Sequence, residues 1–221
     1  MDKFLDQPMQ EQLKKIFGEL VHPVKIVLFT TKQNCVYCEQ IESLLREVTE
    51  LSEKLSFASH DIAENEELAH KYGVNEAPVF VLLGENKGKE LDYQIRFYGM
   101  PGGHEFTSLI NDLMLVSSRD SGLQPETRKF LKGLTQPVHL QVFVTPTCPY
   151  CPQAVVLAHQ MAIESDKVTS DMVEALEFPE WANKFNVSGV PQTTINLGAA
   201  TVIGGVPEES LVEQIKEALA V

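Results

Sequence analysis

The sequence has little of several features that mark particular protein classes. Its 221 residues include only four cysteines and one tryptophan, and 18 lysines and arginines stand against 31 aspartates and glutamates. The net charge of −13 argues against nucleic acid or an anionic membrane surface as a main partner, because both attract basic proteins. A solvated acidic surface that keeps the protein soluble explains this charge without any partner.

Long apolar runs are missing as well. No stretch approaches the roughly 20 apolar residues that cross a membrane, and the N-terminal segment carries Asp2 and Asp6 instead of the apolar core of a signal peptide. We therefore expect a cytoplasmic protein without a membrane segment. Thiols are normally reduced in that compartment, so cysteines there bind metals or take part in catalysis more often than they form structural disulfides.

The four cysteines form two Cys-x-x-Cys pairs at a constant offset. Cys35 and Cys38 lie in "NCVYC", and Cys148 and Cys151 lie 113 residues later in "TCPYC". This period is far longer than that of stacked solenoid repeats. The sequence therefore indicates a duplicated domain, and its length suits two domains of about 100 residues each.

A proline follows each pair at the same distance. Pro78 comes 43 residues after Cys35, and Pro191 comes 43 residues after Cys148. The segments around them, "KYGVNEAPVF" and "KFNVSGVPQT", align at the same offset as the cysteines. A chance match of two cysteine pairs, these segments and two prolines is not credible.

Both halves show the same order of expected elements. Apolar, β-branched runs predict strands that lead into each cysteine pair, and apolar residues at helical spacing predict a helix after it. Each half then reads as a leading helix followed by β-α-β-α-β-β-α. Expected helices outside the cysteine segments are 9–20, 65–73, 104–116, 126–134, 179–186 and 208–220, and expected strands are 25–31, 55–62, 78–84, 94–99, 140–145, 168–175, 191–197 and 200–205.

The connector between the halves is "SSRDSGLQP", residues 117–125, which is small and polar and contains glycine and proline. We predict a first domain at 1–118, with the CVYC motif, and a second at 123–221, with the CPYC motif.

A Cys-x-x-Cys pair between a strand and a helix suits chemistry that cycles. The first cysteine lies near a helix N-terminus, where free N–H groups and the helix dipole stabilise a thiolate. The second lies close enough to form a disulfide with it. The first thiolate can attack a substrate disulfide, and the second cysteine can resolve the mixed disulfide. The first sulfur should therefore be the more exposed and the lower in pKa.

Three competing roles for the cysteines stay open. The two pairs together could hold zinc, although zinc ligand pairs usually sit closer in sequence. Each pair could form a static disulfide, although so short a loop constrains the unfolded chain little. One pair could also have lost its role and be kept only for packing.

The motifs resemble a known family. "CVYC" and "CPYC", each followed 43 residues later by the proline of "APV" or "VPQ", look like the active sites of thioredoxin-fold proteins, and CPYC is the glutaredoxin form. Two such units in one chain resemble the glutaredoxin-like protein disulfide oxidoreductases of thermophilic bacteria and archaea. The resemblance implies an α/β fold of two tandem thioredoxin-like domains. Each would be a central mixed sheet flanked by helices, and the two would join into one continuous sheet.

The resemblance also implies an enzyme that exchanges thiols and disulfides. Protein disulfides would be reduced, oxidised and isomerised through Cys35, Cys38, Cys148 and Cys151, with no cofactor beyond these redox-active disulfides and no metal. The sequence has no G-x-G-x-x-G pattern for a nucleotide, so electrons would come from a separate thioredoxin-reductase-like donor.

A different function class competes with this one. The chain could be a redox relay or docking module of a reductase/peroxidase system, with only one chemically active site. Tandem thioredoxin folds of that sort usually lack one cysteine pair. Both pairs are present here, which favours the enzyme.

In this fold Pro78 and Pro191 would be cis and lie against the cysteine pairs. The residues before them, Ala77 and Val190, would then pair through their backbones with an extended substrate strand. Plain strand-start prolines are the alternative.

The residues between the cysteines would shape the motifs. These are Val36 and Tyr37 in the first, and Pro149 and Tyr150 in the second. Proline at a helix start loses no needed N–H, so we expect Cys148 to be the more reactive of the two first cysteines.

The sequence departs from the thioredoxin pattern in one respect, because neither strand that precedes a cysteine pair carries an acid. Asp61 and Glu174 align near the second strands, and we expect both at the surface. Gly204 and Gly205 resemble a glutathione-holding stretch but suit a strand-end turn equally well. Trp181 is expected to pack in a core.

Overall fold

The computed structural model describes residues 3–33 and 35–220; Asp2 and the last residue of the predicted second domain, Val221, lie outside the described residues. The first half contains α1 (Gln7–Phe17), β1 (Val24–Thr30), α2 (Cys38–Thr49), β2 (Leu55–Asp61), α3 (Glu66–Lys71), β3 (Val79–Asn86), β4 (Lys89–Tyr98) and α4 (Glu105–Ser118). The second half contains α5 (Pro125–Lys132), β5 (Val138–Val144), α6 (Cys151–Glu164), β6 (Val168–Glu174), α7 (Pro179–Lys184), β7 (Gln192–Ile195), η1 (Asn196–Gly198), β8 (Ala200–Ile203) and α8 (Glu208–Leu219).

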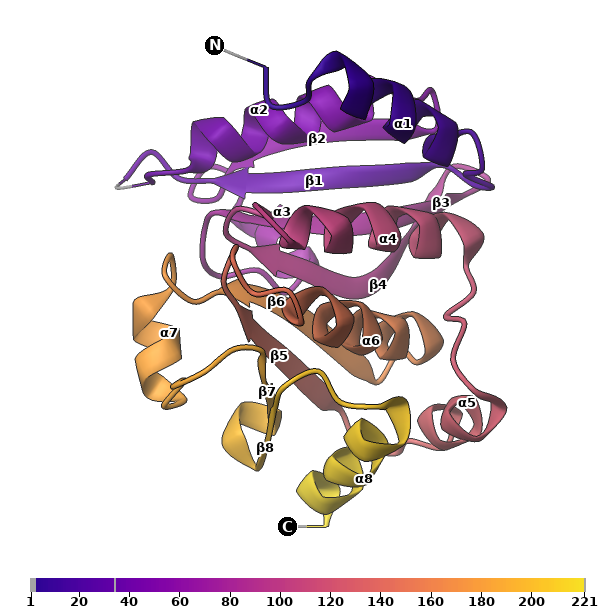
Figure 1. Ribbon diagram of the computed structural model, residues 1–221, viewed down its shortest axis with the longest axis vertical. Helices are drawn as coiled ribbons and strands as arrows, with labels where there is room; N and C mark the ends of the chain where they lie inside the picture. Colours follow the sequence, from indigo (N-terminus) through magenta and orange to yellow (C-terminus); the bar gives the residue numbers. More distant parts are fainter. Residues whose placement is uncertain (1–2, 34, 221) are drawn as a thin grey trace.

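All eight strands belong to one mixed sheet with helices on both faces (Figure 1). The strand order is β2-β1-β3-β4-β6-β5-β7-β8, so each half contributes four neighbouring strands in an equivalent order. The two sets join where β4 pairs in parallel with β6, from Ile95↔Ser170 to Tyr98↔Val173. The expected α/β fold, with two thioredoxin-like domains in one continuous sheet, is confirmed.

The β3–β4 hairpin is longer than the sequence indicated. We expected a broad turn over "GENKGK" and a strand that starts at residue 94, but β4 begins at Lys89 and the turn narrows to Lys87 and Gly88, which have φ of 50° and 79°. The polar residues next to the turn pair across the strands, as Asn86 does with Lys89. Their composition is typical of a loop, but backbone pairing extends the sheet through them.

Two hydrophobic cores cover the two faces of the sheet. One lies under α1, α2, α4, α5, α6 and α8 and includes Phe17, Leu45, Leu113 and Ile215. The other is smaller and lies under α3 and α7, with Phe29, Tyr98 and Phe178 among its members. Because α3 and α7 are short, the second face of the sheet is less completely covered than the first.

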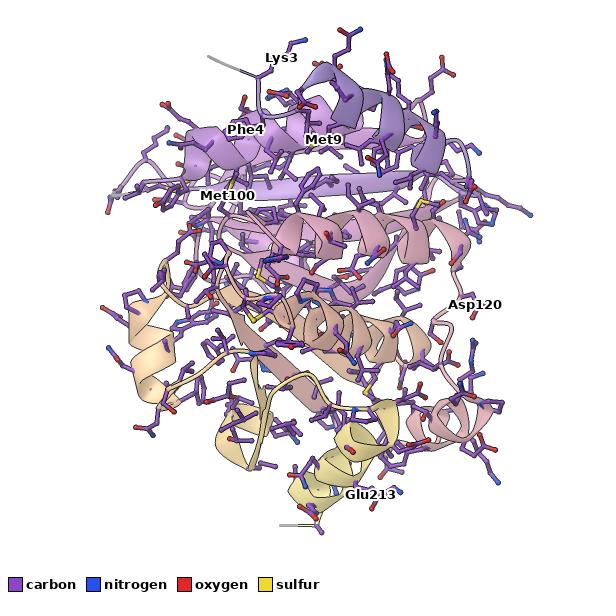
Figure 2. All side chains as sticks on the ribbon, viewed as in Figure 1. Lys3, Phe4, Met9, Met100, Asp120 and Glu213 are labelled. Atoms are coloured by element: carbon purple, nitrogen blue, oxygen red, sulfur yellow. A yellow bond between two sulfur atoms is a disulfide. The ribbon has the colours of Figure 1, made fainter. Side chains whose placement is uncertain are left out.

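The connector runs from the end of α4 to the start of α5. Arg119 follows α4 with φ of 59°, a left-handed conformation that ends the helix. Asp120, labelled in Figure 2, accepts a hydrogen bond of 2.5 Å from Arg128 of α5. The limits at 118 and 123 stay a prediction. No helix in the described part of the chain is long and apolar enough to cross a membrane.

Candidate active sites

Each cysteine pair forms its own disulfide at the end of a central strand. Cys35 and Cys38 follow β1, Cys148 and Cys151 follow β5, and the Cα atoms are 5.6 and 5.5 Å apart within the pairs. Regular helix begins at the second cysteine of each pair, because the tyrosine before it has a non-helical or borderline conformation. The first cysteine therefore lies in the turn that leads into the helix, before the free N–H groups of its first turn.

The first cysteine of each pair is the more exposed, as expected. Cys35 is partly exposed while Cys38 is 8% exposed, and Cys148 is 7% exposed while Cys151 is fully buried. Exposure does not favour Cys148 over Cys35, so the expected lead of Cys148 stays a prediction.

The residues between the cysteines lie on the surface. Val36 and Tyr37 are 73% and 43% exposed, Tyr150 is 68% exposed, and Pro149 is also exposed. A large partner can therefore reach both motifs from the solvent side.

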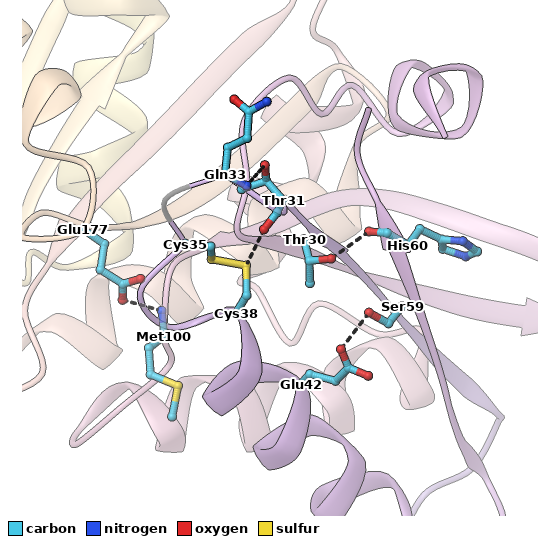
Figure 3. The surroundings of a disulfide bond; sticks show 10 residues. All are labelled: Thr30, Thr31, Gln33, Cys35, Cys38, Glu42, Ser59, His60, Met100 and Glu177. Atoms are coloured by element: carbon cyan, nitrogen blue, oxygen red, sulfur yellow. Dashed lines mark hydrogen bonds between the residues drawn. A yellow bond between two sulfur atoms is a disulfide. The ribbon is translucent and has the colours of Figure 1, made fainter. Parts of the chain in front are cut away.

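The first disulfide lies beside an open depression (Figure 3). This depression has a volume of about 610 Å³ and is lined by Thr30, Thr31, Lys32, both cysteines, Val36, Glu39 and Glu42. Cys38 Sγ lies 3.9 Å from the carbonyl oxygen of Thr31. This carbonyl can accept a hydrogen bond from the Cys38 thiol once the disulfide is reduced.

The Ala77–Pro78 and Val190–Pro191 peptide bonds are both cis, as the family resemblance implied. Both prolines are buried, whereas Ala77 and Val190 are half-buried. Equivalent hydrogen bonds hold the two loops, since Gly99 N–H donates to the Pro78 carbonyl at 3.0 Å and Gly204 N–H to the Pro191 carbonyl at 2.7 Å.

The backbone N–H groups of Ala77 and Val190 donate no hydrogen bond within residues 3–33 and 35–220. They have the free donors that pairing with an extended chain requires.

A carboxyl group from the second half lies beside the first disulfide. Glu177 and Met100 are drawn among the residues around Cys35 and Cys38 in Figure 3, and Met100 N–H donates a hydrogen bond of 2.7 Å to Glu177 Oε1. Burial raises the pKa of Glu177 to about 7, although the bond from Met100 opposes the shift. No local pattern in the sequence points to this group, because it lies in the loop between β6 and α7, far from Cys35 along the chain.

The expectation that Glu174 lies at the surface is wrong. Glu174 is 3% exposed, its Oε1 has no hydrogen-bond partner in the described residues, and its Oε2 accepts a bond of 2.7 Å from Glu177 N–H. Burial raises the pKa of this carboxyl. The cause lies in the join of the two halves, which makes β6 a central strand. Asp61, at the end of the edge strand β2, is only half-buried and caps the next turn.

A second buried carboxyl comes from the first half and lies near the other site. The loop that leads into α4 packs against the segment before Cys148, where His104 N–H donates a bond of 3.0 Å to the Pro146 carbonyl. Glu105 follows in the chain, is 1% exposed and accepts a bond of 2.6 Å from Ser108. Burial raises the pKa of Glu105 to about 7.

The remaining expectations concern Gly204 and Trp181. Gly204 has φ of 89° and forms the turn at the end of β8. Trp181 is half-buried and packs against Tyr98 and Phe178, with ring centroids 4.8 and 5.3 Å away. In the residues that the structure describes, no group of three or more histidines, cysteines and acids could hold a metal ion.

Two family models match separate halves of the chain. One, described as a Glutaredoxin-like domain, matches residues 25–97, and the other, described as a Thioredoxin domain, matches residues 138–217. The CPYC motif had suggested the glutaredoxin likeness for the second half. A whole-domain comparison weighs many more positions than a motif of four residues.

The F component of alkyl hydroperoxide reductase is a relative in two organisms. The protein of Escherichia coli (strain K12) is 26% identical over 194 residues, which are 87% of this chain and 34% of that protein. The protein of Staphylococcus aureus (strain NCTC 8325 / PS 47) is 25% identical over 192 residues, again 87% of this chain and 34% of that protein. The chain thus spans about a third of the length of these relatives.

Two solved structures share the whole architecture. The NTD_N/C domain of alkylhydroperoxide reductase AhpF from Enterococcus faecalis (V583) has a TM-score of 0.86 and 25% identity, and the match covers 96% of this chain and 100% of that one. A protein disulfide oxidoreductase from Aeropyrum pernix K1 has a TM-score of 0.87 and 30% identity over 97% of this chain and 94% of that one. With two Cys-x-x-Cys disulfides on paired thioredoxin folds and this likeness over nearly its full length, the chain belongs to the glutaredoxin-like protein disulfide oxidoreductase family.

Proposed function

We propose that the protein catalyses thiol–disulfide exchange on protein disulfides and uses both cysteine pairs. The observation that carries this proposal is the position of the two pairs. Each is a disulfide at the end of a central strand, with its first cysteine the more exposed and its second nearly or fully buried. That arrangement is what an attacking and a resolving thiol need.

The reductive cycle has two exchange steps. In the reduced protein the thiolate of Cys35 or Cys148 attacks a substrate disulfide, so that a mixed disulfide forms and one substrate thiolate leaves. Cys38 or Cys151, as its thiolate, then attacks the mixed disulfide, forms the internal disulfide and releases the second substrate thiolate. A separate thioredoxin-reductase-like donor returns two electrons to the internal disulfide. Run in reverse, the same steps oxidise a substrate dithiol.

The buried carboxyl groups fit the proton transfers of these steps. A resolving thiol must lose its proton before it attacks, and neither strand that precedes a cysteine pair carries an acid. Glu177 beside the first pair and Glu105 near the second both have a pKa raised to about 7 by burial. A carboxyl group with this pKa exchanges protons readily near neutral pH.

Substrate binding is assigned to the cis-proline loops. The free N–H groups of Ala77 and Val190 suit pairing with an extended polypeptide, and the exposed Val36, Tyr37 and Tyr150 add apolar contact beside the sulfur atoms. Recognition through backbone and apolar groups is independent of any one substrate sequence.

The alternative is a redox relay or docking module with a single active site. The alkyl hydroperoxide reductase relatives favour it, since this chain matches only about a third of their length. The two functions differ in one respect that can be measured, which is whether both cysteine pairs react with a foreign protein disulfide.

Trapping of mixed disulfides tests the proposal. Cys38→Ser and Cys151→Ser variants, reduced and then mixed with insulin, should each accumulate a covalent complex on a non-reducing gel, because the first cysteine attacks and nothing resolves the product. Cys35→Ser and Cys148→Ser carried in the same backgrounds are the matched controls and should remove the complex. A complex from only one of the two resolving variants would support the relay function, and none from either would contradict both.

A further inference from the structure

A row of polar side chains crosses the sheet face that α3 and α7 cover. Arg96 of β4 is paired in register with Asp171 of β6, Asp171 with Gln141 of β5, and Gln141 with Thr194 of β7. Each is at most 8% exposed. The face is otherwise apolar, so these residues place hydrogen-bonding groups where packing alone would favour aliphatic side chains.

A cavity of about 260 Å³ lies over this row, between the end of α3 and α7. Its floor includes Arg96, Asp171 and Gln141, and aromatic side chains of α7 and the residue after it, Trp181 and Phe185, form one wall. Both aromatic residues are only half-buried. A volume of this size admits a molecule with a single aromatic ring and an attached polar group.

Asp171 is already satisfied by its neighbours. Its Oδ1 accepts a bond of 2.6 Å from Arg96 Nε, and its Oδ2 lies 2.5 Å from His139 Nε2. Burial opposes ionisation of this carboxyl, but Arg96 and His139 outweigh burial and hold its pKa below the ordinary value. Asp171 therefore orients the arginine and has no oxygen left for a ligand.

The charges around the cavity favour an anion. Arg96 also donates through Nη1 to the Gly73 carbonyl at 2.5 Å, and its Nη2 donates no hydrogen bond within the described residues. Lys184 lines the rim, with Nζ 5.3 Å from the Phe185 ring centroid. Arg96 and Lys184 together outnumber the single carboxylate, in a chain whose net charge is −13.

Two buried polar atoms in the row have no partner within the described residues. These are Oε1 of Gln141 and Oγ1 of Thr194. An unpaired buried group costs roughly 1–3 kcal/mol, so its retention calls for a compensating role. The Gln141 side chain lines the cavity, and since the two ends of an amide group are interchangeable by rotation, it can donate to or accept from an occupant.

We propose that this cavity binds a small aromatic anion, with the ring against Trp181 and Phe185 and the acidic group at Arg96 and Lys184. Gln141 supplies a further polar contact at the floor. The site is distinct from the cysteine pairs and stands whether or not both pairs are active.

The single tryptophan of the chain provides the measurement, because Trp181 itself forms the wall of the cavity. Phenyl phosphate and benzoate, titrated into the oxidised protein, should each change its fluorescence along a saturable curve. Benzylamine, which has the same ring with a positive charge, should give no saturable change. Inorganic phosphate, which lacks the ring, should bind roughly tenfold more weakly than phenyl phosphate.

Variants locate the binding. Lys184→Glu should weaken phenyl phosphate binding severalfold, whereas Lys14→Glu, a matched reversal at an exposed lysine on α1, should leave it unchanged. In NMR spectra the Gln141 side-chain amide signals should shift with the same midpoint as the fluorescence. The proposal is overturned if neither aromatic anion saturates, if benzylamine binds as well as they do, or if the two lysine variants behave alike.

Discussion

Met100 in the first half and Glu177 in the second are joined by a hydrogen bond of 2.7 Å, from the backbone N–H to the carboxyl oxygen. This bond crosses the line where β4 meets β6 and lies beside the first disulfide (Figure 3). The loop before Glu105 makes the reciprocal contact, from the first half to the segment before Cys148. Each site is therefore completed by the other half, and the two domains are not independent copies.

The raised pKa of Glu177 predicts a pH-dependent stability. Its folded-state pKa of about 7 lies above the ordinary value of 4.5, so between these values the folded state holds a proton that the unfolded state has lost. The free energy of unfolding then falls as pH rises from about 4.5 to 7. Glu177→Gln keeps the acceptor for Met100 but removes this loss. Relative to wild type, the variant should gain about 1–2 kcal/mol at pH 8 and nothing at pH 4.5.

Urea unfolding of the oxidised protein at the two pH values measures this difference. Glu180→Gln, an exposed glutamate on α7, is the matched control and should change stability equally at both. A Glu177→Gln effect of the same size at pH 4.5 and pH 8 would mean that the carboxyl titrates normally.

The pair formed by His159 and Asp112 should be essential for the packing of α4 against α6. Both side chains are fully buried, and His159 Nδ1 lies 2.5 Å from Asp112 Oδ2. His159→Leu leaves an unpaired buried carboxyl and should cost about 3 kcal/mol of unfolding free energy. The double variant His159→Leu/Asp112→Leu should recover most of that loss. Denaturant unfolding measures both, and a single variant as stable as the double would contradict the pairing.

Gly99 should not tolerate a side chain. It has φ of 96°, and an added Cβ would lie 2.8 Å from Glu174 Cβ and 2.9 Å from Glu177 Oε1. Gly99→Ala should cost about 3 kcal/mol, since it combines backbone strain with overpacking. Gly88→Ala in the β3–β4 turn has a similar φ of 79° with no atom within 4 Å of the added carbon, and should cost about 1 kcal/mol. Equal losses in thermal unfolding would show that the contact with Glu174 and Glu177 is unimportant.

The reduced thiols should differ in reactivity within each pair. Cys35 should react with iodoacetamide faster than Cys38, and Cys148 faster than Cys151, because the first cysteine is the more exposed and precedes a helix N-terminus. Mass spectrometry of peptides after brief alkylation gives the order. Faster labelling of Cys38 or Cys151 would reverse the assignment of attacking and resolving thiols.

The features that could be predicted from the sequence are those that repeat or that have local spacing. The 113-residue offset and the alternation of apolar runs were enough for the duplicated domain and the order of its elements. The cis bonds before Pro78 and Pro191 followed from the family resemblance. Glu174 and Glu177 could not be placed, because their burial depends on the pairing of β4 with β6, between residues far apart in the chain. The polar row from Arg96 to Thr194 depends on several such pairings and leaves no periodic trace.

Reduction of insulin disulfides in the presence of dithiothreitol tests the proposed activity most directly. The rate should be lower for Cys35→Ser and for Cys148→Ser than for wild type, and the double variant should fall to the rate of dithiothreitol alone. Both single variants should retain measurable activity if each pair is a working site, with the larger loss expected for Cys148→Ser. A double variant as active as wild type would contradict thiol–disulfide exchange through these cysteines.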